Sequence, residues 1–260
     1  LDCLRAGEQL QIEESLLTDE IHREILPLPF VSLFLDDCVA RGLDCTNGGA
    51  VYNTTGLVAV GTATVADSLY AIKRLVYDEK KLTLGELTEI LRNNFEGQEY
   101  LRQFILNRFE KFGNDQDCVD RLAVGITDAF ADELEKHHNS RGGAFWGALY
   151  SVSAQVGLGN VCCATPDGRL DGLPLSDGLT PMYGMDRNGP TAVLASLSKI
   201  HQKRFPNGII VNQRMSGSLF KTPEGREKMA QLLRAFVAAG CFHWQFNIVD
   251  NKVLLAAQKD

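Results

Sequence analysis

The sequence predicts an α/β protein, and three features of the chain support this fold class. The last third follows the order strand, helix, strand, helix with short connections, which is typical of parallel βαβ units. Segment 241–249, CFHWQFNIV, alternates apolar and polar residues, as a strand with two different faces does. The first half carries apolar residues at helical spacing instead. We therefore expect parallel strands with helices packed outside them.

Helices are predicted for most of the first half. Segment 29–41, PFVSLFLDDCVAR, has helical spacing and stops before Gly42, a favourable residue at a helix end. Segment 62–78 is expected to turn one apolar stripe towards the core, formed by Val65, Leu69, Ile72 and Val76.

Three further helices follow along the chain. Thr83 and Glu86 have the spacing of a capping box, which opens a helix that runs to about Asn94. Helices are also expected over 98–112 and 119–137. The second of these keeps its apolar residues in register, at Val119, Leu122, Ile126, Phe130 and Leu134.

The second half changes to strands and turns. Segment 207–213, NGIIVNQ, is predicted to be a short buried strand. Thr222 and Pro223 supply a cap and a first-turn proline for a helix that Gly240 ends. The strand at 241–249 follows, and then a last helix that Asp250 or Asn251 caps.

Composition and charge exclude several classes of protein. A net charge of −7 without a Lys/Arg cluster argues against nucleic-acid binding. No apolar run approaches the roughly 20 residues of a membrane span. The first residues, LDCLRAGEQLQ, do not resemble a signal peptide, and the seven scattered cysteines fit reduced thiols better than a disulfide framework. We expect a cytoplasmic protein.

Short motifs give neither a metal site nor a catalytic residue set. Segment 56–67, GLVAVGTATVAD, lacks the glycine spacing of dinucleotide or P-loop sites. Segment 112–120, FGNDQDCVD, lacks the central Gly and final Glu of a calcium loop, so Asp117 is expected to cap a helix. Adjacent Cys162 and Cys163 lack a second ligand pair and are interpreted as small packing residues.

Several strings together resemble the glycyl radical enzymes, the family of pyruvate formate-lyase and the B12-independent glycerol and diol dehydratases. They occur in the family's order and cover nearly the whole chain after about residue 26. They are RGLDCTNGGAVYNTTGL, ADSLYAIKRLVYDEKKLT, NRFEKFGND, RGGAFWGALYSVSAQVGLG, ATPDGR with GLPLSDGLTPMYGMDRNGPTAVLASLSKI, and HWQFNIVDNKVLLAAQKD. The dehydratase-like or "second type" formate-lyase-like branch is the most similar.

The resemblance implies a fold and a chemistry. It implies a ten-stranded α/β barrel with outer helices, formed by two half-barrels around the active site. It also implies an activating enzyme that uses S-adenosylmethionine and an iron–sulfur cluster to generate a backbone glycyl radical. The radical passes to a cysteine, whose thiyl form attacks a substrate C–H bond. The expected activity is that of a lyase or transferase of anaerobic metabolism, with formate C-acetyltransferase or glycerol dehydratase as its type.

Neither radical site can be assigned within the 260 residues. The family's Gly-Cys-Val-Glu-type cysteine loop is expected before residue 1, and its R-V-x-G-Y radical loop after residue 260. We therefore expect residues 1–260 to form a single incomplete barrel domain that binds no cofactor itself and is inactive alone. Uncovered strand edges favour a homo-oligomer. The alternative is a non-catalytic scaffold or interaction protein derived from the barrel.

The remaining candidates are residues of the cavity wall, expected to meet a small-molecule substrate. The resemblance implies this role for Tyr150, at an aromatic position that lines the cavity in dehydratase-like members. His243, Gln245 and Asn247 share the polar face of the 241–249 strand, and Asn53 lies in a glycine-containing loop. A structural hydrogen-bond role is the alternative for all five.

Gln155 and the segment 162–169 are expected to lie at the cavity and at the barrel rim, respectively. Gln155 stands where many relatives carry His, which weakens a proton-transfer role there. Segment 162–169, CCATPDGR, is expected to be a strand end and turn at the barrel rim. Arg169 is expected to tether the neighbouring loops through its planar guanidinium group.

Overall fold

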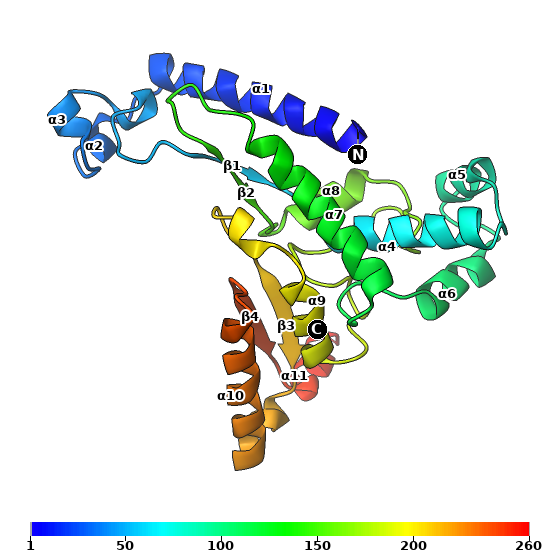
Figure 1. Ribbon diagram of the computed structural model, residues 1–260. Helices are drawn as coiled ribbons and strands as arrows, with labels where there is room; N and C mark the ends of the chain where they lie inside the picture. The colour runs from blue at the N-terminus through cyan, green and yellow to red at the C-terminus, as the bar shows by residue number, and fades with distance from the viewer. Residues whose placement is uncertain (1, 260) are drawn as a thin grey trace. The chain divides into compact units, whose positions relative to one another are not determined.

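The computed structural model describes residues 2–259, which form helices and two short parallel sheets (Figure 1). The four strands are β1 (Thr55–Val58), β2 (Phe145–Ala148), β3 (Val211–Met215) and β4 (Trp244–Ile248). The α-helices are α1 (Asp2–Ile25), α2 (Pro29–Ser32), α3 (Cys38–Arg41), α4 (Thr62–Ile72), α5 (Leu84–Arg92), α6 (Glu99–Arg108), α7 (Asp117–Leu134), α8 (Ala154–Val161), α9 (Pro190–Ser198), α10 (Pro223–Ala238) and α11 (Asn251–Ala257). Short 3-10 or π-helical turns are η1 (Cys45–Asn47), η2 (Lys73–Asp78), η3 (Gln202–Arg204) and η4 (Gly217–Lys221).

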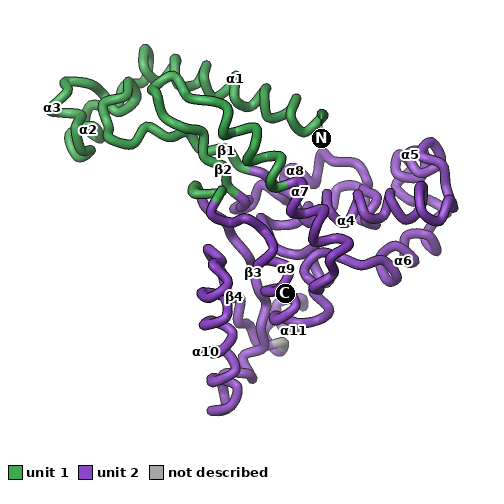
Figure 2. The backbone as a smooth tube through the Cα atoms, in the orientation of Figure 1, with its two compact units in different colours: residues 1–58, 127–148, 204–207 green, residues 59–126, 149–203, 208–260 purple. Residues whose placement is uncertain are grey.

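The chain divides into two compact units, which Figure 2 distinguishes by colour. Unit 1 comprises residues 1–58, 127–148 and 204–207, and unit 2 comprises residues 59–126, 149–203 and 208–260. Unit 1 contains the parallel pair β1–β2, and unit 2 contains the parallel pair β3–β4. The predicted α/β class, with mixed helices and parallel strands, is confirmed.

Unit 1 has a core in which aromatic rings pack against β2. The rings of Phe130 and Phe205 are stacked with centroids 6.3 Å apart. Gly147 of β2 lies so close to them that a Cβ atom there would be 3.0 Å from Phe205 and 3.2 Å from Leu134. Glycine is therefore required for the strand to approach this cluster.

Unit 2 contains the predicted β3–α10–β4 unit. The two strands pair in parallel, with Val211 opposite Trp244 and Met215 opposite Ile248. α10 runs alongside the pair (Figure 1), and the Phe236 ring on this helix lies 4.9 Å from the Trp244 ring. The apolar face of β4 is thus directed towards α10, which leaves its polar face free for another role.

Several predicted helix ends are confirmed by their hydrogen bonds. Thr83 accepts from the Glu86 amide at 3.2 Å, and the Glu86 carboxylate accepts from the Thr83 amide at 2.7 Å. Thr222 accepts from the Gly225 amide at 3.0 Å at the start of α10. Asp250 accepts from the Lys252 amide at 3.2 Å at the start of α11. These caps stabilise their helices by about 1 kcal/mol each.

The prediction of one helix over 29–41 is wrong. Two single helical turns, α2 and α3, occupy its ends, and Asp37 between them has a left-handed φ of 73°. The Ser32 hydroxyl donates to Asp44 at 2.8 Å, and the Asp44 carboxylate accepts from the Leu28 amide at 3.2 Å. Such side-chain bonds compete with the helical pattern and fold the segment back on itself. Gly42 does end α3 in the left-handed region, as predicted.

The prediction for the buried face of α4 is also wrong. Val65 and Leu69 remain 44% and 40% exposed, whereas the buried face carries small residues and one carboxylate. Besides Tyr70, its members are Thr62, Ala63, Thr64, Ala66, Asp67, Ser68 and Ala71. Small side chains let neighbouring segments approach the helix closely, and this packing outweighs the greater hydrophobicity of the valine and leucine stripe.

Segment 162–169 follows a helix rather than a strand, so that part of its prediction is wrong. Cys162 is the residue after α8, and Ser153 precedes this helix. The small residues Ala154, Gly157 and Gly159 conceal the helical periodicity of α8. All seven cysteines are free thiols in the described chain.

The tethering role predicted for Arg169 is confirmed. Its guanidinium is buried and donates to the backbone carbonyls of Leu170 at 3.1 Å and Cys162 at 3.0 Å. It also donates to the carbonyls of Cys163 and Leu173. One side chain therefore holds the end of α8 and the loop that follows.

Among residues 2–259, no helix combines the length and apolar character that crossing a membrane would require.

Candidate functional site

A polar cavity of about 340 Å³ lies beside β3 and β4, entirely within unit 2. Its walls come from the loop 177–186 and from both strands. The lining residues are Asp177, Thr180, Pro181, Met182, Tyr183, Gly184, Asp186, Asn212, Arg214 and Asn247. Carboxylate, amide, hydroxyl and guanidinium groups all face this space, which makes it the candidate functional site.

Strand register explains why polar residues from β3 and β4 share one face. Asn212 lies opposite Gln245, and Arg214 lies opposite Asn247. In a parallel pair, opposite residues project to the same side of the sheet. The polar face predicted for β4 alone therefore extends onto β3.

A chain of hydrogen bonds orients the amides in the cavity. Asn247 donates from its side-chain amide to Asn212 Oδ1 at 3.2 Å, and Asn212 donates in turn to Asp177 Oδ2. Asp177 Oδ1 accepts from the Ser151 hydroxyl. Both carboxylate oxygens of Asp177 are thus used, so this residue fixes the orientation of Asn212 and, through it, Asn247.

A glycine allows the 177–180 loop to approach the strand region. Gly178 has a φ of +55°, and a Cβ atom there would lie 2.6 Å from the Ile210 carbonyl oxygen and 2.9 Å from that of Leu149. Thr180 then accepts from the Asn212 amide at 2.9 Å. Only a residue without a side chain places Asp177 this close to β3.

The other side of the cavity is charged. The Arg214 guanidinium lies 5.5 Å from the centre of the Tyr183 ring, within the range of a cation–π contact. Asp186 accepts from the Gln213 amide at 3.2 Å. The arrangement is suited to hydrogen bonding with hydroxyl, carbonyl or carboxylate groups of a small molecule. None of the described cysteines lines it, so it offers binding and orientation rather than a thiol nucleophile.

The structure brings one of the five predicted residues to this cavity. Asn247 lines it. Gln245 is exposed on the same face of β4 but is not part of the wall. His243 is exposed just before β4, and its carbonyl oxygen accepts from the Val211 amide at 3.3 Å.

Tyr150 and Asn53 lie elsewhere in their own units. Tyr150 is half-buried in unit 2, where its ring carbons are 3.4 Å from the position that a Cβ atom would take on Gly208. Asn53, in unit 1, donates to the carbonyl of Ala50 at 2.8 Å and to that of Gly48 at 3.4 Å. Its amide therefore stabilises its own loop, and substrate contact by either residue stays a prediction.

Nine of the ten lining residues escaped the sequence analysis, among them Asn212, Arg214 and Asp177. Asn212 and Arg214 alternate along β3 and were detectable as polar positions in a strand that follows an apolar run. Asp177 carries no such signal, because it lies in a turn-rich segment where aspartate is common.

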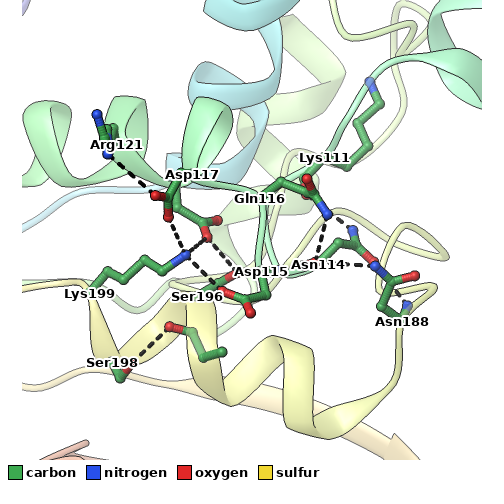
Figure 3. Close-up of polar contacts among 12 residues, drawn as sticks. Lys111, Asn114, Asp115, Gln116, Asp117, Arg121, Asn188, Ser196, Ser198 and Lys199 are labelled. Atoms are coloured by element: carbon green, nitrogen blue, oxygen red, sulfur yellow. Dashed lines mark hydrogen bonds and ion pairs between the residues drawn. The ribbon is translucent and has the colours of Figure 1, made fainter.

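A second polar cluster in unit 2 joins α7 to α9 (Figure 3). The Lys199 ammonium lies 2.8 Å from Asp115, 2.8 Å from Asp117 and 2.7 Å from Asp120. The fully buried Asp120 also accepts from the Ser196 hydroxyl at 3.0 Å. Burial raises the pKa of Asp120, whereas Lys199 lowers the pKa of Asp117. The three carboxylates of the segment compared with a calcium loop therefore share one lysine as their partner, and we interpret the cluster as structural.

Comparison with known proteins identifies the family. A model of the pyruvate formate lyase-like family matches residues 8–159, and a model of the glycine radical domain matches residues 175–260. The first covers more than half of the chain. The chain belongs to the pyruvate formate lyase-like family, and the predicted resemblance to glycyl radical enzymes is confirmed.

Curated relatives include dehydratases and lyases. Trans-4-hydroxy-L-proline dehydratase from Clostridioides difficile is 36% identical over 251 residues, which cover 96% of this chain and 32% of the relative. (2S)-3-sulfopropanediol dehydratase from Klebsiella oxytoca is 36% identical over 248 residues, covering 94% of this chain and 30% of the relative. The chain therefore spans about a third of the length of these relatives.

Solved structures agree with this assignment. Glycerol-bound B12-independent glycerol dehydratase from Clostridium butyricum superimposes with a TM-score of 0.88 at 42% identity, covering 93% of this chain and 31% of that one. A structure concerned with 1,2-propanediol dehydration in Roseburia inulinivorans has a TM-score of 0.94 at 39% identity. The match covers 98% of this chain and 33% of that one.

Proposed function

We propose that the chain is the central and C-terminal part of a glycyl radical lyase or dehydratase. The whole enzyme would cleave a C–O or C–C bond of a small oxygenated substrate, as a diol dehydratase or a formate acetyltransferase does. The observation that carries the proposal is the oriented amide pair Asn212–Asn247 beside Arg214, in a chain of this family. Fixed amides and a guanidinium suit the hydroxyl and carboxylate groups of such substrates.

The two parallel strand pairs are proposed to be parts of the ten-stranded α/β barrel, with residues 1–260 as one incomplete domain. Within unit 2, a parallel bridge between Leu149 and Ile209 brings the chain after β2 beside the chain before β3. Parallel pairing and helical crossovers are the components from which such barrels are built.

The polar wall is proposed as this chain's contribution to catalysis. A glycyl radical, generated by an S-adenosylmethionine and iron–sulfur activating enzyme, would supply hydrogen-atom abstraction in the whole enzyme. Asn247 and Asn212 would hold the substrate hydroxyls, and Gln245, His243, Tyr150 and Asn53 are retained as proposed substrate contacts. The expected cytoplasmic location and homo-oligomeric state also remain proposals.

The chain alone is expected to acquire no glycyl radical, because its 260 residues contain no R-V-x-G-Y string. Anaerobic incubation with a glycyl radical activating enzyme, S-adenosylmethionine and a reductant should give no doublet in electron paramagnetic resonance. A full-length dehydratase treated with its own activating enzyme is the positive control. To locate any signal, this chain is labelled with deuterated glycine while the activating enzyme is not. A doublet that then loses its splitting would show that the radical lies on this chain, which would contradict the expectation.

Substrate binding by the polar cavity is tested with propane-1,2-diol. We expect saturable shifts of the Asn212 and Asn247 side-chain amide signals in nuclear magnetic resonance. Asn247→Ala should weaken binding by about 2- to 10-fold, the value of one net hydrogen bond.

The exposed Asn160 on α8 provides the matched control, and Asn160→Ala should bind the diol as the unchanged chain does. Equal weakening in both variants, or saturable binding that leaves the Asn212 and Asn247 signals unmoved, would contradict the assignment of this cavity. Such a result would favour the scaffold alternative.

A further inference from the structure

A second cavity of about 320 Å³ lies in unit 2 and combines an apolar body with buried charged groups. Leu106 of α6 and Leu173, Pro174 and Met185 of the 167–185 segment supply its apolar wall. Its volume is at the small end of the roughly 300–1,000 Å³ that ligand pockets span. Met182 and Tyr183 line this cavity and the polar cavity alike, so they form a shared wall.

Asp67 presents an unsatisfied oxygen in this cavity wall. The residue is only 1% exposed and projects from α4. Its Oδ1 accepts from the Phe112 amide at 2.8 Å, while its Oδ2 has no hydrogen-bond partner among the described residues. A buried polar atom without a partner is unfavourable by about 1–3 kcal/mol, so a ligand that completes its bonding gains affinity.

Two buried cations line the same cavity. The Lys111 ammonium is almost fully buried and, within the described residues, donates a hydrogen bond to the Asp167 carbonyl at 2.8 Å. Figure 3 shows its side chain extending away from the Lys199 cluster. Arg169 donates its side-chain bonds to neutral oxygens, namely backbone carbonyls and the Thr165 hydroxyl. Buried cations of this kind favour a nearby anion.

The protonation state of Asp67 adds to this preference. Burial raises its pKa to about 8; Asp167 and Asp120 raise it as well, and Lys111 opposes them. The other charged or titratable groups of the wall are Arg102, Arg169 and Tyr183. At neutral pH, Asp67 is therefore a neutral acid. Since Oδ1 accepts from the Phe112 amide, the proton lies on Oδ2, which can donate a hydrogen bond to a ligand.

We infer that this cavity binds a short aliphatic monocarboxylate, with its carboxylate between Lys111 and Asp67 Oδ2 and its chain against Leu106 and Met185. The carboxylate would accept from both groups and balance the buried positive charge. The methylene chain would cover the apolar wall, which favours binding through burial of apolar surface. This site lies outside the function proposed for the polar cavity.

Hexanoate is the probe, titrated into the full chain at pH 6.5 and followed by calorimetry. Hexanol and hexylamine have the same apolar chain without the negative charge. We expect hexanoate to bind at least 10-fold more tightly than either. The inference would be overturned if hexylamine bound more tightly than hexanoate, or if hexanoate showed no saturable binding.

Three variants locate the site. Lys111→Met should weaken hexanoate binding at least 10-fold, and Leu106→Trp should abolish it by filling the cavity. Asp67→Asn keeps an acceptor for Phe112 and a donor for the ligand, so it should bind at pH 6.5 as the unchanged chain does. The unchanged chain should lose affinity between pH 7 and 9, because a carboxylate at Asp67 repels the ligand, whereas the variant should not.

Lys203→Met, at an exposed lysine, is the matched control and should leave binding unchanged. Circular dichroism of each variant verifies folding. If Lys111→Met does not fold, the inference is still tested by Leu106→Trp and by comparing the pH profiles of the unchanged chain and Asp67→Asn. Unaltered binding in folded Leu106→Trp, or the same loss of affinity with pH in Asp67→Asn, would overturn the inference.

Discussion

Replacing Lys199 by methionine is expected to destabilise the protein by about 1–3 kcal/mol at pH 7, because buried Asp120 loses its charged partner while Lys199 and the other two aspartates are partly exposed. Its ammonium lies within 2.8 Å of three carboxylates, and one of them, Asp120, is fully buried. Methionine preserves most of the side-chain volume, so the loss reports charge rather than packing. Urea unfolding measures the change in the free energy of unfolding.

The defect should also be smaller at acidic pH. Without the lysine, burial keeps the pKa of Asp120 raised and the Ser196 hydrogen bond offsets it only in part, so protonation relieves the unpaired charge. Lys203→Met, at an exposed lysine, should change the free energy of unfolding by less than about 0.5 kcal/mol. A loss below about 1 kcal/mol in Lys199→Met at pH 7 would show that the cluster contributes little.

Replacing Asp67 by asparagine is expected to stabilise the protein, and the gain should grow with pH. The pKa of Asp67 is raised from 3.8 to about 8, so between these values the folded state holds a proton that the unfolded state has released. Stability of the unchanged chain therefore falls as pH rises through this window. The free energy of unfolding of the unchanged chain should fall by about 1.4 kcal/mol per pH unit. Asparagine does not titrate, so Asp67→Asn should lack this dependence.

Urea unfolding of both proteins at pH 5, 6 and 7 measures this slope. We expect the advantage of Asp67→Asn to widen by about 1.4 kcal/mol per unit. Asp171→Asn, at an exposed aspartate, serves as the control for the loss of a negative charge. Parallel pH profiles for the unchanged chain and Asp67→Asn would show that Asp67 is ionised in the folded protein.

Local signals in the sequence predicted local structure well. Thr83 and Glu86 form the predicted capping box, and Thr222 and Pro223 open α10, because each of these features depends on residues within one helical turn. The β3–α10–β4 unit followed from hydrophobic period and loop length. Asn247 was found for the same reason, since its place on the polar face of β4 is a property of the strand alone.

Features that depend on distant partners were missed. The break in segment 29–41 depends on Asp44, which lies beyond the end of the segment. The buried face of α4 is the face that carries Asp67, whose bond is to the Phe112 amide. Asp177 becomes part of the site only because Gly178 lets its loop approach β3. Neither hydrophobicity nor spacing within one segment contains such information.

By itself, the sequence determined the α/β class, most of the helices, the parallel order of the C-terminal elements and the family. These follow from residue periodicity, caps and strings that are contiguous in the chain. Only the tertiary structure decided which polar groups meet: Asp177 with Asn212, Lys199 with three aspartates, and Lys111 with Asp67 around one cavity. The reason is physical, because burial and hydrogen bonding are properties of the surroundings that packing creates.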